Sequence, residues 1–199
     1  MTITPHAPAR NLEIKVACGD DGLADAIARL STLGTSVSER LAQVDTYFRA
    51  PQGRLKLRTI AHVREDDEAG DVVDAQLIGY ERIDREGSRW SSYHVVPIPA
   101  PEGDRLRTTL SATIGTLVTV TKRRDIAIAG HTRIHLDRVE GLGAFIELET
   151  VIAGQSDADA AAEHQRIIDT LGLDRWPAVP GSYSDLLRDV SRESEARRP

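Results

Sequence analysis

Alternation of polar and apolar residues with a period of two runs through much of the chain and constrains its fold more than any other feature. In NLEIKV (11–16) polar side chains alternate with aliphatic ones, and in GRLKLR (53–58) three cations alternate with two leucines. This period predicts strands with one apolar and one polar face. Further strands are predicted in QLIGYERI (76–83), RWSSYHVVPI (89–98), VTVTKRR (118–124), TRIHLD (132–137) and FIELE (145–149).

Segments with helical spacing lie between and after these strands. The spacing of apolar residues, together with capping residues at the ends, predicts helices over 20–34, 101–115, 156–171 and about 182–190. REDDEAGDVVD (64–74) has no periodicity and is expected to be a hairpin tip or loop, and His62 and His164 are expected at the surface. The chain is predicted to form one α+β domain over 10–190, between a disordered arm (1–9) and a disordered tail (191–199).

Composition narrows the classes of partner and the compartment. The chain has 199 residues and a net charge of −6, so its overall field does not favour nucleic acid, and any anion site must be a local cluster of cations. A single cysteine excludes an internal disulfide and indicates a cytoplasmic protein. No apolar run approaches the roughly 18 residues of a membrane span. We expect a monomer or homodimer without a nucleic-acid or membrane partner.

Charges on the polar faces of the predicted strands are partly sorted by sign. Cations dominate the middle strands, whereas anions dominate the first and the late ones. Like charges in one row repel each other, as Arg54, Lys56 and Arg58 must on their strand. The cations are Lys15, Arg54, Lys56, Arg58, Arg82, Lys122, Arg124 and Arg133, and the anions are Glu13, Asp137, Glu147 and Glu149.

Two arrangements of the sheet fit this sorting. An open sheet could expose its polar face to solvent, which accounts for mixed charges on one or two strands. A closed sheet would instead enclose the charges and place the aliphatic faces under the helices. In a closed sheet, the repulsion within GRLKLR would be relieved only by a bound anion, so phosphate should raise the melting temperature.

A closed sheet of this kind would have a definite chemistry. Arginine and lysine bind the paired oxygens of a string of phosphates. Aspartate and glutamate supply the oxygen ligands that Mg²⁺ and Mn²⁺ prefer. The two charge sets together therefore indicate a site for a metal ion and a polyphosphate.

Several segments, in their order, resemble the CYTH domain family of class IV adenylyl cyclases and thiamine triphosphatases, also called triphosphate tunnel metalloenzymes. The resemblance runs from about residue 10 to about residue 190. It implies an α+β fold in which eight antiparallel strands form a closed barrel, the triphosphate tunnel, with helices packed outside. The segments are NLEIK, QVDTYFRAPQGRLKLR, LIGYER, TKRR, TRIHLDRVEGLGAFIELE and GSYSDLL.

The resemblance also implies roles for individual residues. The hallmark of the family is Glu-x-Glu-x-Lys, which here is Asn11, Glu13 and Lys15, so a neutral amide replaces the first carboxylate. Either a second metal ion is then held more weakly, or other carboxylates hold it. Glu13 and Lys15 would be catalytic. The Mg²⁺ or Mn²⁺ ligands would be Glu13, Asp137, Glu147 and Glu149, and the substrate contacts Arg54, Lys56, Arg58, Arg82, Lys122, Arg124, Arg133 and Tyr183.

The implied function is a metal-dependent enzyme that binds a small-molecule triphosphate and cleaves it, whether inorganic, thiamine or nucleoside triphosphate. We favour hydrolysis because the implied contacts are phosphate contacts and no pair of purine-reading residues is visible. The alternative is an adenylyl cyclase that converts ATP to cyclic AMP and pyrophosphate. A third interpretation is a non-catalytic module that binds polyphosphate or nucleotide. His135 is either a hydrogen-bonded interior residue or a phosphate contact or proton donor.

Overall fold

The computed structural model describes residues 9–64, 66–82 and 88–196. These residues form eight strands and four α-helices, of which two lie between strands and two follow the last strand. The strands are β1 (Ala9–Ala17), β2 (Val37–Phe48), β3 (Arg54–Val63), β4 (Ala69–Arg82), β5 (Arg89–Ile98), β6 (Thr116–Ala129), β7 (Thr132–Val139) and β8 (Gly143–Val151). The helices are α1 (Gly19–Arg29), α2 (Ala100–Thr113), α3 (Asp157–Leu171) and α4 (Tyr183–Ala196).

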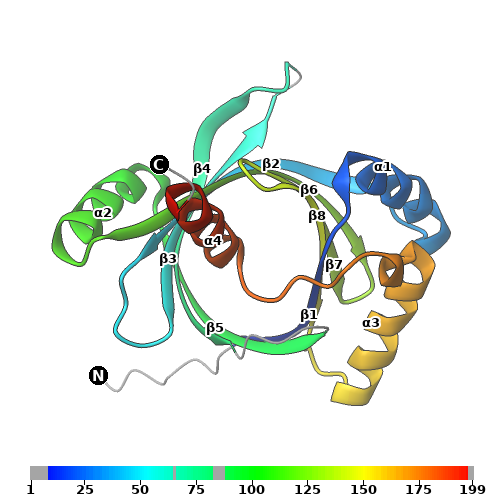
Figure 1. Ribbon diagram of the computed structural model, residues 1–199. Coiled ribbons are helices and arrows are strands. Elements are labelled where there is room, and N and C mark those ends of the chain that lie inside the picture. Colours follow the sequence, from blue (N-terminus) through cyan, green and yellow to red (C-terminus); the bar gives the residue numbers. More distant parts are fainter. Residues whose placement is uncertain (1–8, 65, 83–87, 197–199) are drawn as a thin grey trace.

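The eight strands form one antiparallel sheet that closes on itself. The hydrogen-bonded order is β1-β5-β4-β3-β2-β6-β7-β8, and β8 pairs with β1 to complete a closed barrel. Figure 1 looks along the barrel axis, so that the strands appear as a ring. The predicted α+β fold of eight antiparallel strands is confirmed, and the interior of the ring is where the charged faces were expected to point.

Three helices cover the outside of the barrel, and the fourth lies at one end. Helices α1 and α3 pack beside β1 and β8, and α2 lies against β3 and β4 (Figure 1). Helix α4 projects across the ring in this view and packs against β6. The C-terminal helix predicted at about 182–190 therefore lies at one mouth of the barrel.

The main hydrophobic core lies between the outer face of the barrel and helices α1 and α3. The aliphatic residues of the late strands supply its sheet side, as the alternation predicted: Ile134, Leu136, Ile146 and Leu148 are each at most 1% exposed. Their partners on the helices include Leu23, Ile167 and Leu171. This core fixes the orientation of the strands, because turning any of them over would exchange its aliphatic and charged faces.

Capping residues and apolar spacing predicted the positions of the helices, whereas the first strand and the last helix extend beyond the predicted domain limits. Ser156 caps α3 by accepting a hydrogen bond from the backbone N–H of Asp159 at 3.1 Å. Strand β1 begins at Ala9, and α4 continues to Ala196, beyond the limits of 10 and 190 that the sequence suggested. The segment expected to be a loop over 64–74 is shorter, because β4 already begins at Ala69. No helix within the described ranges is long and apolar enough to cross a membrane.

The expectation that His164 is a surface residue is wrong. Its side chain is 1% exposed and lies on the face of α3 that carries Ile167, Ile168 and Leu171. Its Nδ1 lies 2.8 Å from the hydroxyl of Thr150, and its Nε2 lies 3.2 Å from the hydroxyl of Ser88. Burial lowers the pKa of His164 to about 4, although nearby Glu163 opposes the shift.

This histidine should make stability depend on pH. An unfolded histidine takes up a proton near pH 6.5, whereas folded His164 resists protonation until about pH 4. The contribution of His164 to the free energy of unfolding is therefore complete above pH 6.5. As the pH falls toward 4, up to about 3 kcal/mol of it is lost. Urea unfolding between pH 7 and pH 5 should show a shallower loss in His164→Gln than in the wild type. His131→Asn, at an exposed histidine, should behave like the wild type, and equal slopes in all three would contradict this assignment.

Candidate active site

A cavity inside the barrel brings together most of the residues that the sequence singled out. Among the side chains that the structure describes, six cations line it, three lysines and three arginines, and all three lysines of the chain are among them. Three glutamates, one aspartate and four tyrosines complete its charged and aromatic lining. The cations are Lys15, Lys56, Arg58, Lys122, Arg124 and Arg133, the carboxylates Glu13, Asp45, Glu147 and Glu149, and the tyrosines Tyr47, Tyr80, Tyr93 and Tyr183.

Asp45 of β2 lies in the middle of the basic side of the cavity. Register places it directly opposite Arg58, which donates two hydrogen bonds to its carboxylate at 2.7 and 2.8 Å. Lys56 donates to the same carboxylate at 3.0 Å, and the Nζ of Lys122 lies 4.0 Å away. Burial would raise the pKa of Asp45, but Arg58 and Lys56 hold it well below the usual range. The carboxylate is therefore ionised and balances part of the surrounding charge.

This finding corrects the expectation that only a bound anion relieves the repulsion within GRLKLR. Lys56 and Arg58 are held by Asp45 in the protein itself. These cations already have a counter-charge, so a bound phosphate chain would have to compete with the carboxylate of Asp45 for them. The partial sorting of charges into basic and acidic strands is thus less complete in the barrel than along the sequence.

Arg124 and Asp137 form a second buried ion pair. Arg124 donates two hydrogen bonds of 2.6 Å to the two oxygens of Asp137, and a third of 2.9 Å to Glu147. Asp137 also accepts a hydrogen bond of 2.8 Å from the hydroxyl of Tyr183, and its side chain is fully buried. Both oxygens of Asp137 are therefore occupied by donors of the protein itself.

Tyr183 connects helix α4 to this interior network. Its ring lies 4.1 Å from the Nζ of Lys15 and 5.2 Å from the Nζ of Lys122, within the range of cation–π contacts. Burial shifts the pKa values of Lys122 and Tyr183 in opposite senses: it lowers that of the Lys122 ammonium to about 7 and raises that of the Tyr183 hydroxyl well above 10. Tyr183 thus remains a neutral hydrogen-bond donor, whereas Lys122 can lose its proton near neutral pH.

The acidic side of the cavity is built from two cross-strand rows on β1, β8 and β7. In one row Glu149 lies between Glu13 and Arg133, and in the other Glu147 lies between Lys15 and His135. Glu13 and Glu149 are like charges in directly opposite positions, which is unfavourable without a nearby cation. The Nζ of Lys15 lies 3.2 Å from Glu147. Each row thus combines carboxylate oxygens with at least one cation or imidazole.

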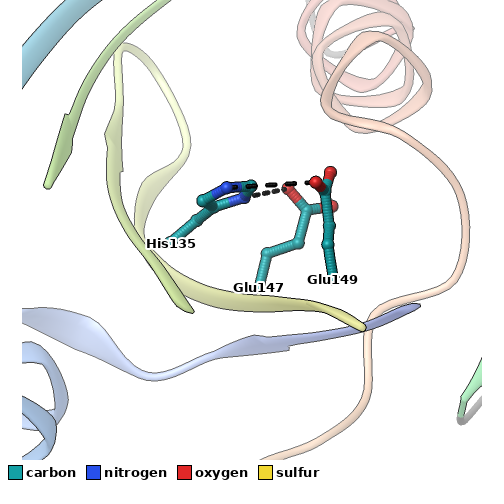
Figure 2. A group of neighbouring side chains, drawn as sticks. All are labelled: His135, Glu147 and Glu149. Atoms are coloured by element: carbon teal, nitrogen blue, oxygen red, sulfur yellow. Dashed lines mark ion pairs between the residues drawn. The ribbon is translucent and has the colours of Figure 1, made fainter. Parts of the chain in front are cut away.

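One group of side chains has a donor set that fits a metal ion. Glu147, Glu149 and His135 each offer one ligand atom, and these atoms lie within 4.8 Å of one another (Figure 2). Burial and the neighbouring Arg124 lower the pKa of His135, so its imidazole is neutral and has a free lone pair at neutral pH. Carboxylate oxygens suit Mg²⁺ and Mn²⁺, and a neutral imidazole suits transition-metal ions. The residues present therefore fit a divalent cation.

Three of the predicted site residues, Arg54, Arg82 and Asp137, do not line the cavity or cannot be placed. Arg54 does not line the cavity, and its guanidinium donates to Asp185 of α4 at 2.9 Å. The backbone of Arg82 ends β4, but its side chain lies outside the described residues. Asn11 is buried on β1, in register with Val151 and two pairs beyond Glu13. Among the predicted metal ligands, Asp137 is engaged by Arg124 and does not belong to the group in Figure 2.

Sequence reasoning placed Tyr183 at the cavity but missed Asp45 and Tyr47. Asp45 lies in LAQVDTYF (41–48), where alternate positions 43, 45 and 47 form one face. That alternation was the available signal, and it would have placed Asp45 and Tyr47 inside. Tyr80 and Tyr93 are direct partners across β4 and β5, which only the register of the two strands reveals.

The fold and site define a class of protein, a closed antiparallel barrel whose interior combines a cluster of cations with carboxylates. A model of the CYTH domain matches residues 9–183, and the chain therefore belongs to the CYTH domain family. Among curated proteins, none matches the chain.

Solved structures resemble this barrel over most of its length. The PH1012 protein from Pyrococcus horikoshii is 20% identical, with a TM-score of 0.68 over 88% of this chain and 98% of its own. A candidate adenylate cyclase from Vibrio parahaemolyticus is 19% identical, with a TM-score of 0.62 over 92% and 99%. A chain of the Schizosaccharomyces pombe Mediator head module is 11% identical, with a TM-score of 0.58 over 82% and 94%. At these identities the similarities establish a shared fold and nothing further.

Proposed function

We propose that this protein binds a small-molecule triphosphate inside the barrel and cleaves it as a phosphohydrolase that depends on a divalent metal ion. The observation that carries the proposal is the convergence of six cations from four strands on one cavity that also holds three glutamates. A string of phosphates requires several cations at successive positions, because each unit carries its own negative oxygens. Membership of the CYTH domain family supports the same function.

Each side of the cavity has a part in this proposal. Lys56, Arg58 and Lys122 would bind the phosphate chain on the basic side. Glu13, Glu147 and Glu149 would hold Mg²⁺ or Mn²⁺, which when bound neutralises charge that develops on the phosphate oxygens. Lys15 lies between Glu147 and Tyr183 and would orient the phosphate nearest the metal. We leave Asp137 out of the metal set because it neither lines the cavity nor belongs to the group of possible ligands, and Arg124 and Tyr183 donate to its oxygens.

One observation favours the second candidate, an adenylyl cyclase. Tyr80 and Tyr93 lie opposite each other across β4 and β5, and both line the cavity. Aromatic rings at the edge of a phosphate site can stack on a base. In cyclisation the 3′-hydroxyl of the nucleotide would be the nucleophile in place of water, and pyrophosphate would leave.

A panel of substrates separates the candidates. The purified protein is incubated with Mg²⁺ or Mn²⁺ and with tripolyphosphate, thiamine triphosphate or ATP, and the products are resolved by chromatography. We expect orthophosphate from at least one of the three and no cyclic nucleotide. Cyclic AMP with pyrophosphate would establish the cyclase instead, and tight binding without turnover would leave a binding module.

The basic side of the cavity can be tested by one substitution. Lys56→Ala should weaken tripolyphosphate binding by about tenfold or more, because a charge-assisted hydrogen bond contributes roughly 1.5–3 kcal/mol. The melting temperature should change little, since Asp45 keeps Arg58 and Lys122 as partners. Isothermal titration calorimetry measures the affinity. Arg40→Ala removes one exposed cation from β2 and should leave the affinity unchanged; equal losses in both variants would exclude a specific role for Lys56.

A further inference from the structure

His135 is a buried imidazole with an unsatisfied nitrogen. Its side chain is 3% exposed, and it projects from β7 toward Glu147 and Glu149 of β8 (Figure 2). The Nδ1 atom lies 3.7 Å from Glu147, and the Nε2 atom lies 4.0 Å from Glu149. Both separations exceed a hydrogen bond, and Nδ1 has no hydrogen-bond partner within the part of the chain that the structure describes.

Leaving such a nitrogen unpaired in the interior is unfavourable, since a buried polar group without a partner loses its hydration and gains nothing. The charges of the two glutamates do not explain the arrangement. Glu147 is already balanced by Lys15 and Arg124, and Glu149 by Arg133. What remains unsatisfied is the Nδ1 atom of the imidazole, which lies near the two carboxylates without a hydrogen bond to either. A cation bound by all three groups would satisfy it.

We propose that His135 is itself a ligand of the metal ion, together with Glu147 and Glu149, and that it makes the site prefer a first-row transition-metal ion to Mg²⁺. Imidazole nitrogen is a good ligand for such ions and a poor one for Mg²⁺, which prefers oxygen ligands and retains its waters. The proposal rests on the metal ion of the proposed function and adds to it the identity of one ligand and the class of metal.

The ligand can be observed directly with Mn²⁺ as the probe and without substrate. Mn²⁺ bound to the wild-type protein should show modulation from one coordinated nitrogen in pulsed electron paramagnetic resonance. His135→Asn should lose this modulation and weaken Mn²⁺ binding by at least about tenfold, with a much smaller effect on Mg²⁺. His135→Asp supplies a third carboxylate and should narrow the preference for Mn²⁺ over Mg²⁺. His131→Asn, at an exposed histidine in the β6–β7 turn, is the matched control and should behave like the wild type.

The outcomes separate this inference from the proposed function. Absence of nitrogen modulation at saturating Mn²⁺ in the wild type would overturn the inference, even if a His135 variant failed to fold. So would unchanged Mn²⁺ affinity in a folded His135→Asn protein, although metal-dependent triphosphate cleavage could still be found. Conversely, nitrogen coordination without any cleavage in the substrate panel would support the metal site and reject the hydrolase.

Discussion

Replacing Asp45 with asparagine should lower the free energy of unfolding by about 3–5 kcal/mol, the range for breaking a buried ion pair by removing one partner. The amide would retain the shape of the side chain but leave Lys56, Arg58 and Lys122 without their shared counter-charge. Tripolyphosphate should restore much of this loss, because it supplies the missing anion and binds the folded protein alone. Urea unfolding with and without tripolyphosphate measures both effects.

The comparison with the wild type is the decisive part of this experiment. In the wild-type protein the polyphosphate must compete with Asp45, so its stabilising effect should be smaller than in the variant. Asp125→Asn is the matched control, since Asp125 pairs with the exposed Arg40 at 3.4 Å on the outside of the barrel. It should lose less than about 1 kcal/mol. If tripolyphosphate stabilised Asp45→Asn no more than the wild type, the phosphate site would not lie at these three cations.

The second large effect is expected at Asp137, where stability and metal binding can be separated. Asp137→Asn should destabilise the fold by about 3–5 kcal/mol, because it leaves the buried Arg124 with Glu147 as its remaining carboxylate. Its affinity for Mn²⁺, measured by calorimetry on the folded protein, should remain within about threefold of the wild type, as expected when no ligand is lost.

Glu149→Gln provides the converse case. Glu149 is 20% exposed at its side chain and belongs to the group of possible ligands, so this variant should keep most of its stability and lose Mn²⁺ affinity by at least about tenfold. A loss of Mn²⁺ affinity in Asp137→Asn as large as in Glu149→Gln would return Asp137 to the metal ligands that the family resemblance implied.

Much of the fold could be predicted from the sequence because alternation fixes which face of each strand is buried under helices. Ile134 and Leu136 pack outward in the core, and Arg133 and His135 lie on the opposite face as expected. The position of His164 could also have been predicted, since it continues the apolar face of α3 with Ile167 and Leu171. The expectation that His164 lies at the surface followed from its polar side chain and neglected its position on the helix.

The partners of the charged residues could not be predicted in the same way. Alternation places Lys56 and Arg58 on the inner face, but their partner Asp45 belongs to β2. The register between two strands cannot be deduced from the sequence of either strand alone. Arg124 and Asp137 are likewise partners across two strands, although the resemblance implied that Arg124 binds substrate and Asp137 a metal ion. A closed barrel brings every inner face toward one space, so charges can neutralise each other across it before any ligand binds.

The three lysines of the chain all lie at the cavity, so the outer surface of the barrel has no lysine. Its outer positive charge is carried by arginine, so the protein's only side-chain amines lie inside the barrel at Lys15, Lys56 and Lys122. Burial lowers the pKa of Lys122 to about 7, so near neutral pH a large fraction of this side chain is the nucleophilic free amine. A small acylating or carbonyl reagent would therefore act as an affinity label for the cavity without being designed as one. Immobilising the protein through its lysine side chains would instead modify residues of the cavity and obstruct substrate binding.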